Sequence, residues 1–150
     1  MQFVTPELNL TARQIGEDFC RLTLEYGTIL PDSGETIRQL ANKYPLTIVS
    51  NGFVEMQYVK INKSGLADCF KYVVLSEETG AQKPNPIIYQ KALQLNSITA
   101  DEAIMIGDSY SSDIQGAVNA GIDQIWITQQ PDNKPATYIV KQLKDVLNIL

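Results

Sequence analysis

The chain contains no histidine and only two cysteines among its 150 residues. Because histidine is the commonest metal ligand and the usual general base near neutral pH, we expect neither a zinc centre nor catalysis by a Ser-His or Cys-His pair. The cysteines, Cys20 and Cys69, lie far apart in the sequence. We expect both to be reduced, in the core of a cytoplasmic protein.

Long apolar runs and an excess of basic charge are missing as well. No apolar run approaches the length of a membrane span, and the first ten residues lack the basic region and apolar stretch of a secretory signal. The formal net charge is −5, which argues against binding to nucleic acids or anionic membranes. The sequence therefore predicts a cytoplasmic protein with no nucleic-acid or membrane partner.

What the chain does contain is an alternation of short apolar runs with helical patterns, within a length that fits one domain. Strands are expected at 46–50, 72–76, 103–107 and 124–128, with a possible fifth at 137–140. Helices are expected at 11–27, 54–64, 111–120 and 141–150, and another is opened by Pro84 and Pro86 with Ile87, Ile88, Ala92 and Leu95 buried. Continuous apolar strands alternating with helices indicate an α/β fold with a doubly wound parallel sheet.

Polar residues follow three of these predicted strands. The first ends at Ser50, with Asn51 and Gly52 next to it, Lys83 follows the loop after the second, and Asp108 follows the third, with Asp113 at the start of the next helix. Ligands bind at the carboxyl ends of strands in open α/β sheets. Hydroxyl, N–H and ammonium groups suit a phosphate, and carboxylates suit Mg²⁺. The set predicts a phosphate bridged to magnesium.

Each of these residues also has a purely structural interpretation. Asp113 is as readily a helix cap, Lys83 a surface lysine, and Ser50 to Gly52 a simple turn. Asp108 is harder to explain in that way, because a carboxylate at the end of a buried strand is costly unless it is paired or bound to metal.

The order of the segments "IVSNG", "SEETGAQKPNPIIYQKAL" and "MIGDSYSSDIQGAVNAG" resembles the haloacid dehalogenase superfamily of phosphohydrolases. The resemblance covers nearly all of residues 30–150 and is strongest to the branch with a helical cap that includes pyrimidine 5′-nucleotidases. It implies residues 31–150 as a Rossmann-like core and residues 1–30 as the remnant of the cap. It also implies Mg²⁺-dependent hydrolysis of a small phosphate ester such as a nucleoside monophosphate.

The resemblance assigns a role to each polar residue. Ser50 would hydrogen-bond the phosphoryl group, with the backbone at Asn51 and Gly52 assisting. Lys83 would neutralise charge on the phosphate and on the nucleophile. Asp108 would coordinate Mg²⁺, and Asp113 would lie beside it, bound through water or orienting the loop.

One motif of the superfamily has no counterpart in this sequence. Its members begin with an apolar strand ending in D-x-D, whose first aspartate attacks phosphorus and whose second acts as acid and base. No D-x-D occurs anywhere in the 150 residues. The resemblance places that strand between the strands that end at Ser50 and Gly107, so two interior sheet edges would be left unpaired.

Two interpretations of the function follow. In the first, the chain is the C-terminal portion of a phosphatase and is inactive alone. In the second, it is a natural short module that binds phosphate, metal or a partner without catalysis. Either the two strands close on each other, or another chain fills the space, as in a homo-oligomer or a swapped dimer.

Overall fold

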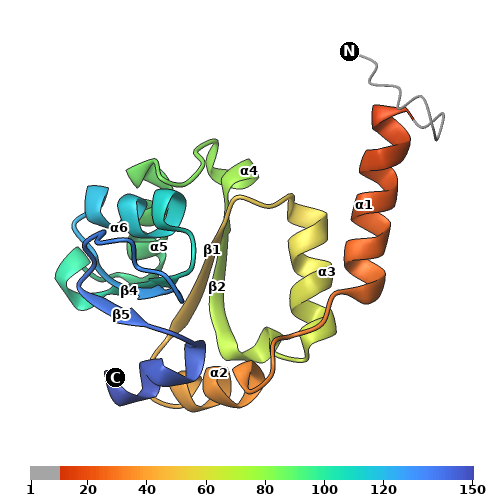
Figure 1. Cartoon of the computed structure of the whole chain (residues 1–150). Coiled ribbons are helices and arrows are strands. Elements are labelled where there is room, and N and C mark those ends of the chain that lie inside the picture. Colours follow the sequence, from red (N-terminus) through yellow and green to blue (C-terminus); the bar gives the residue numbers. More distant parts are fainter. Residues whose placement is uncertain (1–10) are drawn as a thin grey trace.

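The computed structural model of the protein describes residues 11–150 (Figure 1). Its elements alternate as the sequence predicts. The strands are β1 (Leu46–Ser50), β2 (Phe70–Leu75), β3 (Ile104–Gly107), β4 (Asp123–Ile127) and β5 (Tyr138–Val140). The α-helices are α1 (Ala12–Tyr26), α2 (Ser33–Ala41), α3 (Val54–Ser64), α4 (Ser76–Thr79), α5 (Pro86–Asn96) and α6 (Gln115–Asn119).

The strands form two parallel sheets. Strand β1 pairs with β2 in one sheet, and the other has the order β3-β4-β5. All five predicted strands are confirmed, and so are their parallel direction and the α/β class. Within the described residues β1 and β3 do not pair with each other. Of the outcomes considered from the sequence, closure of these two strands on each other is therefore wrong for this chain.

Helices cover both faces of the sheets, as expected for a doubly wound fold. On one face, Ile88 and Tyr89 of α5 and Ala117 of α6 form a core with Val74 of β2. On the other face, Leu40 of α2 and Val146 pack with Ile125 of β4 and Val140 of β5. Partly buried residues of β1 and β3 join both clusters. The two sheets are thus held together through the helices above and below them.

Several helical predictions need correction. The residues predicted as a closing helix at 141–150 form only a 3₁₀ segment, Leu143–Asn148. Helix α5 begins at Pro86, with the Asn85 side chain as its cap. Ile87, predicted to be buried, is 52% exposed, whereas Tyr89 is buried. Within α5, Ile87 therefore lies on the solvent side, whereas Ile88 and Tyr89 face the core.

Helix α1 lies beside α3, away from the two sheets (Figure 1). Thr11 and Gln14 form a capping box at its start. The apolar residues along one side of the helix, Ile15, Phe19, Leu22 and Tyr26, are exposed, and Phe19 and Tyr26 are the most accessible. That the segment is the remnant of a cap stays a prediction. Across residues 11–150, no helix has the length and apolar character needed to cross a bilayer.

Candidate functional site

The carboxyl ends of β1 and β3 meet at the side chain of Lys83. Its Nζ atom donates to the main-chain oxygen of Val49 in β1 at 2.8 Å. It also donates to Oδ1 of Asp113, which follows β3, at 2.7 Å. One ammonium group therefore bridges the ends of the two sheets, and the predicted meeting of Lys83 and Asp113 at this edge is confirmed.

The Lys83–Asp113 ion pair is nearly dry. The two side chains are 12% and 7% exposed. Burying a charge is costly unless an opposite charge and hydrogen bonds compensate, and here each group supplies that compensation for the other. The interpretation of Lys83 as a surface lysine is wrong.

Asp113 is held in place from three sides. Its Oδ2 accepts the Ser109 backbone N–H at 3.1 Å, and its Oδ1 accepts the Ser112 hydroxyl at 3.3 Å. The residue lies in a π-helical turn, Tyr110–Ile114, where a straight α-helix was predicted. Gly107 permits this close approach, because a Cβ atom there would overlap the Asp113 side chain. The carboxylate is therefore both a turn-capping group and the counter-ion of Lys83.

Tyr89 supports the π-helical turn that carries Asp113. Its hydroxyl donates to the main-chain oxygens of Ser112 and Asp113, at 2.8 and 3.2 Å, and Gly116 leaves room for its ring. Burial, and secondarily the charge of Asp113, raise the pKa of the phenol well above its ordinary value. Sequence reasoning missed this residue, because a tyrosine in a helix gives no sign of which carbonyl its hydroxyl will reach.

Asn51 fixes the main chain of Lys83. Its Oδ1 accepts the Lys83 N–H at 2.7 Å, and its Nδ2 donates to the Lys83 oxygen at 3.1 Å. Ser50 lies next to it, and its Oγ accepts the Gly52 N–H at 3.2 Å. Since that bond uses Oγ as an acceptor, the hydroxyl proton remains available for a ligand. The three predicted residues of this turn thus lie at the same edge as Lys83.

Asp108 differs from Asp113. Its side chain is exposed, and its main-chain oxygen accepts the Trp126 indole N–H at 3.0 Å. The argument that Asp108 must be paired because it is buried is therefore wrong, since the carboxylate projects into solvent beyond the end of β3. Exposure leaves its oxygens open to a hydrated cation.

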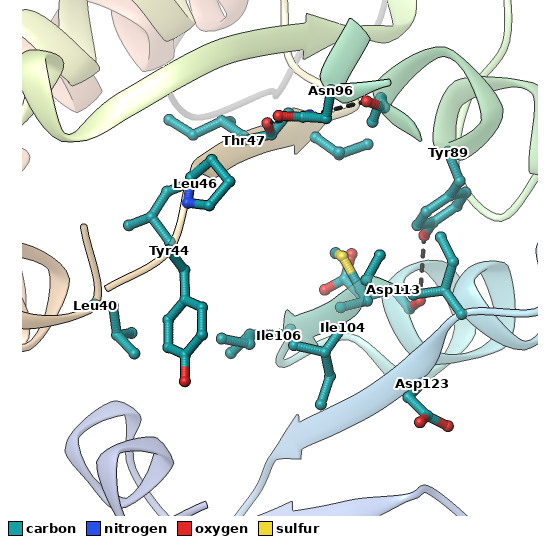
Figure 2. A pocket seen from close by; sticks show the side chains of 18 of the residues that line it. Leu40, Tyr44, Leu46, Thr47, Tyr89, Asn96, Ile104, Ile106, Asp113 and Asp123 are labelled. Carbon is teal, nitrogen blue, oxygen red and sulfur yellow. Dashed lines mark hydrogen bonds between the residues drawn. The ribbon is translucent and has the colours of Figure 1, made fainter. Parts of the chain in front are cut away.

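A large cavity extends from this edge between β1 and β3. It has a volume of about 710 Å³. Figure 2 shows Leu46 and Thr47 of β1 on one side, Ile104 and Ile106 of β3 on the other, and Tyr89 toward one end. Lys83, Asp108 and Asp113 line it at the carboxyl ends of the strands. The cavity is thus apolar along the strands and polar at the candidate site.

The two aspartates fit a magnesium site only in part. Among residues 11–150 no cluster of three acidic or cysteine side chains could enclose a metal. Mg²⁺ is nevertheless commonly held by one or two carboxylates together with water and a substrate phosphate. The open carboxylate of Asp108 suits that role, whereas Asp113 is already engaged by Lys83.

Comparison with known proteins identifies the family of this chain. The sequence pattern of haloacid dehalogenase-like hydrolases matches residues 11–127. The chain belongs to that family. The resemblance drawn from the three segments is therefore confirmed.

Similar proteins of the family include named enzymes. Pyrimidine 5′-nucleotidase YjjG of Escherichia coli (strain K12) is 32% identical over 148 residues, which are 95% of this chain and 66% of that protein. The glyceraldehyde 3-phosphate phosphatase of Pyrococcus furiosus is 32% identical over 129 residues, which are 81% and 54% of the two chains.

A solved structure also matches the fold. The crystal structure of the HAD-hydrolase YfnB from Bacillus subtilis bound to magnesium superposes with a TM-score of 0.86 and 29% identity, covering 96% of this chain and 65% of that one. The chain thus spans roughly half to two thirds of the length of these relatives.

Proposed function

We propose that this chain forms the phosphate-binding part of a Mg²⁺-dependent hydrolase of small phosphate monoesters. The buried Lys83–Asp113 pair between the ends of β1 and β3 carries the proposal. A buried cation fixed at the carboxyl edge of parallel strands is placed to meet an anion. Membership of a family that includes phosphatases and a nucleotidase supports the same reaction class.

Each residue at this edge makes a different contribution to the binding of a phosphoryl group. The Lys83 ammonium offsets its negative charge, and the Ser50 hydroxyl donates to one of its oxygens. Asn51 acts indirectly, since its side chain holds the Lys83 main chain. Asp113 accepts from the Lys83 ammonium and so holds it at the edge. Because these groups are fixed before a ligand arrives, little reorganisation opposes binding.

Asp108 would hold the magnesium ion. Bound there, Mg²⁺ would supply further positive charge to the phosphate. The exposed carboxylate fits a cation that retains most of its water. Asp113, with its oxygens engaged by Lys83, Ser109 and Ser112, orients the loop that carries Asp108.

The reaction also needs a carboxylate that attacks phosphorus and a group that protonates the leaving oxygen. The sequence contains no D-x-D motif that could provide both. We therefore propose that a strand from outside these 150 residues supplies them, and that the chain alone does not turn over substrate. A module that binds phosphate or metal without catalysis remains the alternative.

For the substrate, we propose a nucleoside 5′-monophosphate. The support is the name of the E. coli relative, which matches 95% of this chain. Glyceraldehyde 3-phosphate phosphatases among the similar proteins point to other small phosphate esters as the competing class.

Calorimetric titration with inorganic phosphate tests the binding site. We expect phosphate to bind only when Mg²⁺ is present, and binding to weaken about tenfold in Ser50→Ala and Asp108→Asn, as for the loss of one hydrogen bond to a charged group. Thr28→Ala, which removes an exposed hydroxyl from the loop between α1 and α2, is the control. Equal binding by all four proteins would refute the proposed site.

Hydrolysis of p-nitrophenyl phosphate and of a nucleoside monophosphate tests the missing nucleophile. We expect no Mg²⁺-dependent turnover by the chain as it stands, because its sequence contains no D-x-D motif to supply the attacking carboxylate. Turnover that Asp108→Ala abolishes would contradict this expectation.

A further inference from the structure

Trp126 is the only tryptophan of the chain, and its indole reaches the loop that carries Asp108. It lies in β4 opposite Gly107, the last residue of β3, in the register of the sheet. From there its Nε1 atom donates to the main-chain oxygen of Asp108 at 3.0 Å. The β3–β4 pairing ends at Gly107, so a side chain of β4 supplies a hydrogen bond just beyond the end of the ladder.

This hydrogen bond is one that the buried indole cannot easily exchange for another. Trp126 is only 4% exposed, and an indole N–H is a donor without any acceptor capacity. A buried N–H that loses its partner carries the full cost of its desolvation. The main chain of Asp108 is therefore tied to the sheet, although the side chain of the same residue is exposed.

Tyr110 packs on the same indole and holds it from the other side. The two ring centroids lie 4.9 Å apart with the planes inclined at 60°, a tilted arrangement that aromatic pairs favour. The Tyr110 hydroxyl donates to the main-chain oxygen of Pro135 at 3.3 Å, and Lys134 Nζ lies 5.3 Å from the centre of the Tyr110 ring. The segment that follows Asp108 is thus attached both to β4 and to the loop 128–137 between β4 and β5.

Fixing the main chain matters more at Asp108 than at Asp113. The Asp113 carboxylate is held directly, by Lys83 and by its own turn. The Asp108 carboxylate is exposed, so the main chain that carries it largely determines where its oxygens lie. Groups that orient a metal-binding residue raise its affinity for the metal, because less conformational freedom is lost when the ion binds.

We propose that Trp126 is a positioning residue for magnesium binding. Through its bond to the main-chain oxygen of Asp108, the indole holds the exposed carboxylate at the edge where the phosphate binds. Tyr110 keeps the indole in that position. The inference rests on the proposed role of Asp108 as the residue that holds Mg²⁺, and it adds a residue that acts through Asp108 without touching the ion.

Calorimetric titration with Mg²⁺ at saturating inorganic phosphate tests the proposal. Trp126→Phe keeps an apolar ring but lacks the N–H, and we expect its Kd for Mg²⁺ to rise about fivefold, as for the loss of one uncharged hydrogen bond. Ile125→Val is the matched control. It shortens the neighbouring buried side chain, which lies in the core cluster on the opposite face of β4, and should leave the Kd unchanged. Urea denaturation of both variants separates a loss of stability from a loss of binding.

The fluorescence of the single tryptophan gives a second readout, which a merely structural role would not move. An indole bonded to the main chain of the metal-binding residue should respond when the cation arrives. We expect the emission of the wild type to change with Mg²⁺ at the same midpoint as the calorimetric titration. In Asp108→Asn the change should move to about tenfold higher Mg²⁺ concentration, while the emission change on unfolding in urea is retained.

The possible failures of the two proposals are distinguishable. Wild-type affinity for Mg²⁺ in Trp126→Phe, equal weakening in Trp126→Phe and Ile125→Val, or an emission that does not follow Mg²⁺ binding would refute the positioning role. Weakened binding by Asp108→Asn would in those cases still support the proposed function. No Mg²⁺ binding by the wild type, or equal binding by Asp108→Asn, would refute the proposed function and this inference with it.

Discussion

Strands β3 and β4 are neighbours in one sheet, yet within residues 11–150 only β4 is paired on both sides. Strand β4 pairs on both sides, and its central residues Gln124, Ile125 and Trp126 are buried. Strand β3 pairs on one side, and all four of its residues are only half-buried. Apolar strands without polar alternation are suited to full burial. The sequence of β3 therefore suits a strand paired on both sides, but the described residues place no strand along its second edge.

The polar edge next to β3 behaves differently. Lys83, Asn51 and Asp113 satisfy one another without help from any further strand. The polar residues at the carboxyl ends of the strands are thus held in place even though β1 and β3 are not paired with each other. Substitutions at the polar edge and in strand β3 should therefore differ in their effects on stability.

The largest effect is expected from Asp113→Ala, which leaves the Lys83 ammonium buried without its counter-ion. Unfolding free energy should fall by about 3–5 kcal/mol, measured by urea denaturation. Replacing both groups, as in Lys83→Met with Asp113→Leu, should cost less than the single change. The exposed pair of Lys144 and Asp32 is the control, and Lys144→Met should cost less than about 1 kcal/mol. If Asp113→Ala lowered the unfolding free energy by no more than Lys144→Met does, the Lys83–Asp113 pair would not be shielded from solvent.

Truncating matched isoleucines compares the two strands directly. Ile106 of β3 faces Ile125 of β4 in the register of the sheet. Ile125→Ala should cost about 2–5 kcal/mol, as for other fully buried positions, and Ile106→Ala about half of that. Equal losses in urea denaturation would mean that β3 is as well packed as β4.

Adding a methyl group at Gly107 should disturb the edge by overpacking. The new Cβ of Gly107→Ala would overlap Asp113, which we expect to cost about 1–3 kcal/mol and to weaken phosphate binding. Gly16→Ala in α1 meets no neighbouring atom and should raise helix stability by about 1 kcal/mol. Thermal melts measure the stability of both variants, and phosphate titration measures binding by Gly107→Ala. Unchanged phosphate binding in Gly107→Ala would contradict a fixed Asp113.

The smallest effect is expected from Tyr89→Phe, which removes the hydrogen bonds to the turn and should cost about 1 kcal/mol. Because folding raises the pKa of this phenol, the native state keeps the proton longer than the unfolded chain. Its contribution is complete below about pH 10 and is lost as pH rises above that value. The wild type should therefore lose stability in this range more steeply than Tyr89→Phe. Parallel slopes would refute the raised pKa.

Much of this arrangement is predictable from the sequence, because it depends on local pattern. Continuous apolar runs located the five strands, and the parallel direction then brought Ser50, Lys83 and Asp113 to one edge. Through the resemblance to the haloacid dehalogenase superfamily, the absence of D-x-D also predicted the open space between β1 and β3. The strand positions and their shared edge need only periodicity and the rules of sheet topology.

Features that depend on side-chain packing were not predictable. From the sequence, Asp108 is the carboxylate expected to need a partner and Asp113 is as readily a helix cap, but Asp108 is exposed and Asp113 is buried in a π-helical turn against Gly107. Ile87 and Tyr89 flank the buried Ile88 in α5, and of the two it is Tyr89 that faces the core. How a helix is rotated against the sheet decides which of two such neighbours is buried, and no pattern in the sequence fixes that rotation.

Residue-resolved amide exchange of the unliganded chain tests the central claim most directly. We predict that amides of β1 and β3 on the edges facing the cavity exchange rapidly, whereas those bonded within the β1–β2 and β3–β4–β5 sheets are protected. Slow exchange at every amide of β1 and β3, independent of protein concentration, would contradict the account, because it would mean that the two strands already pair across the space.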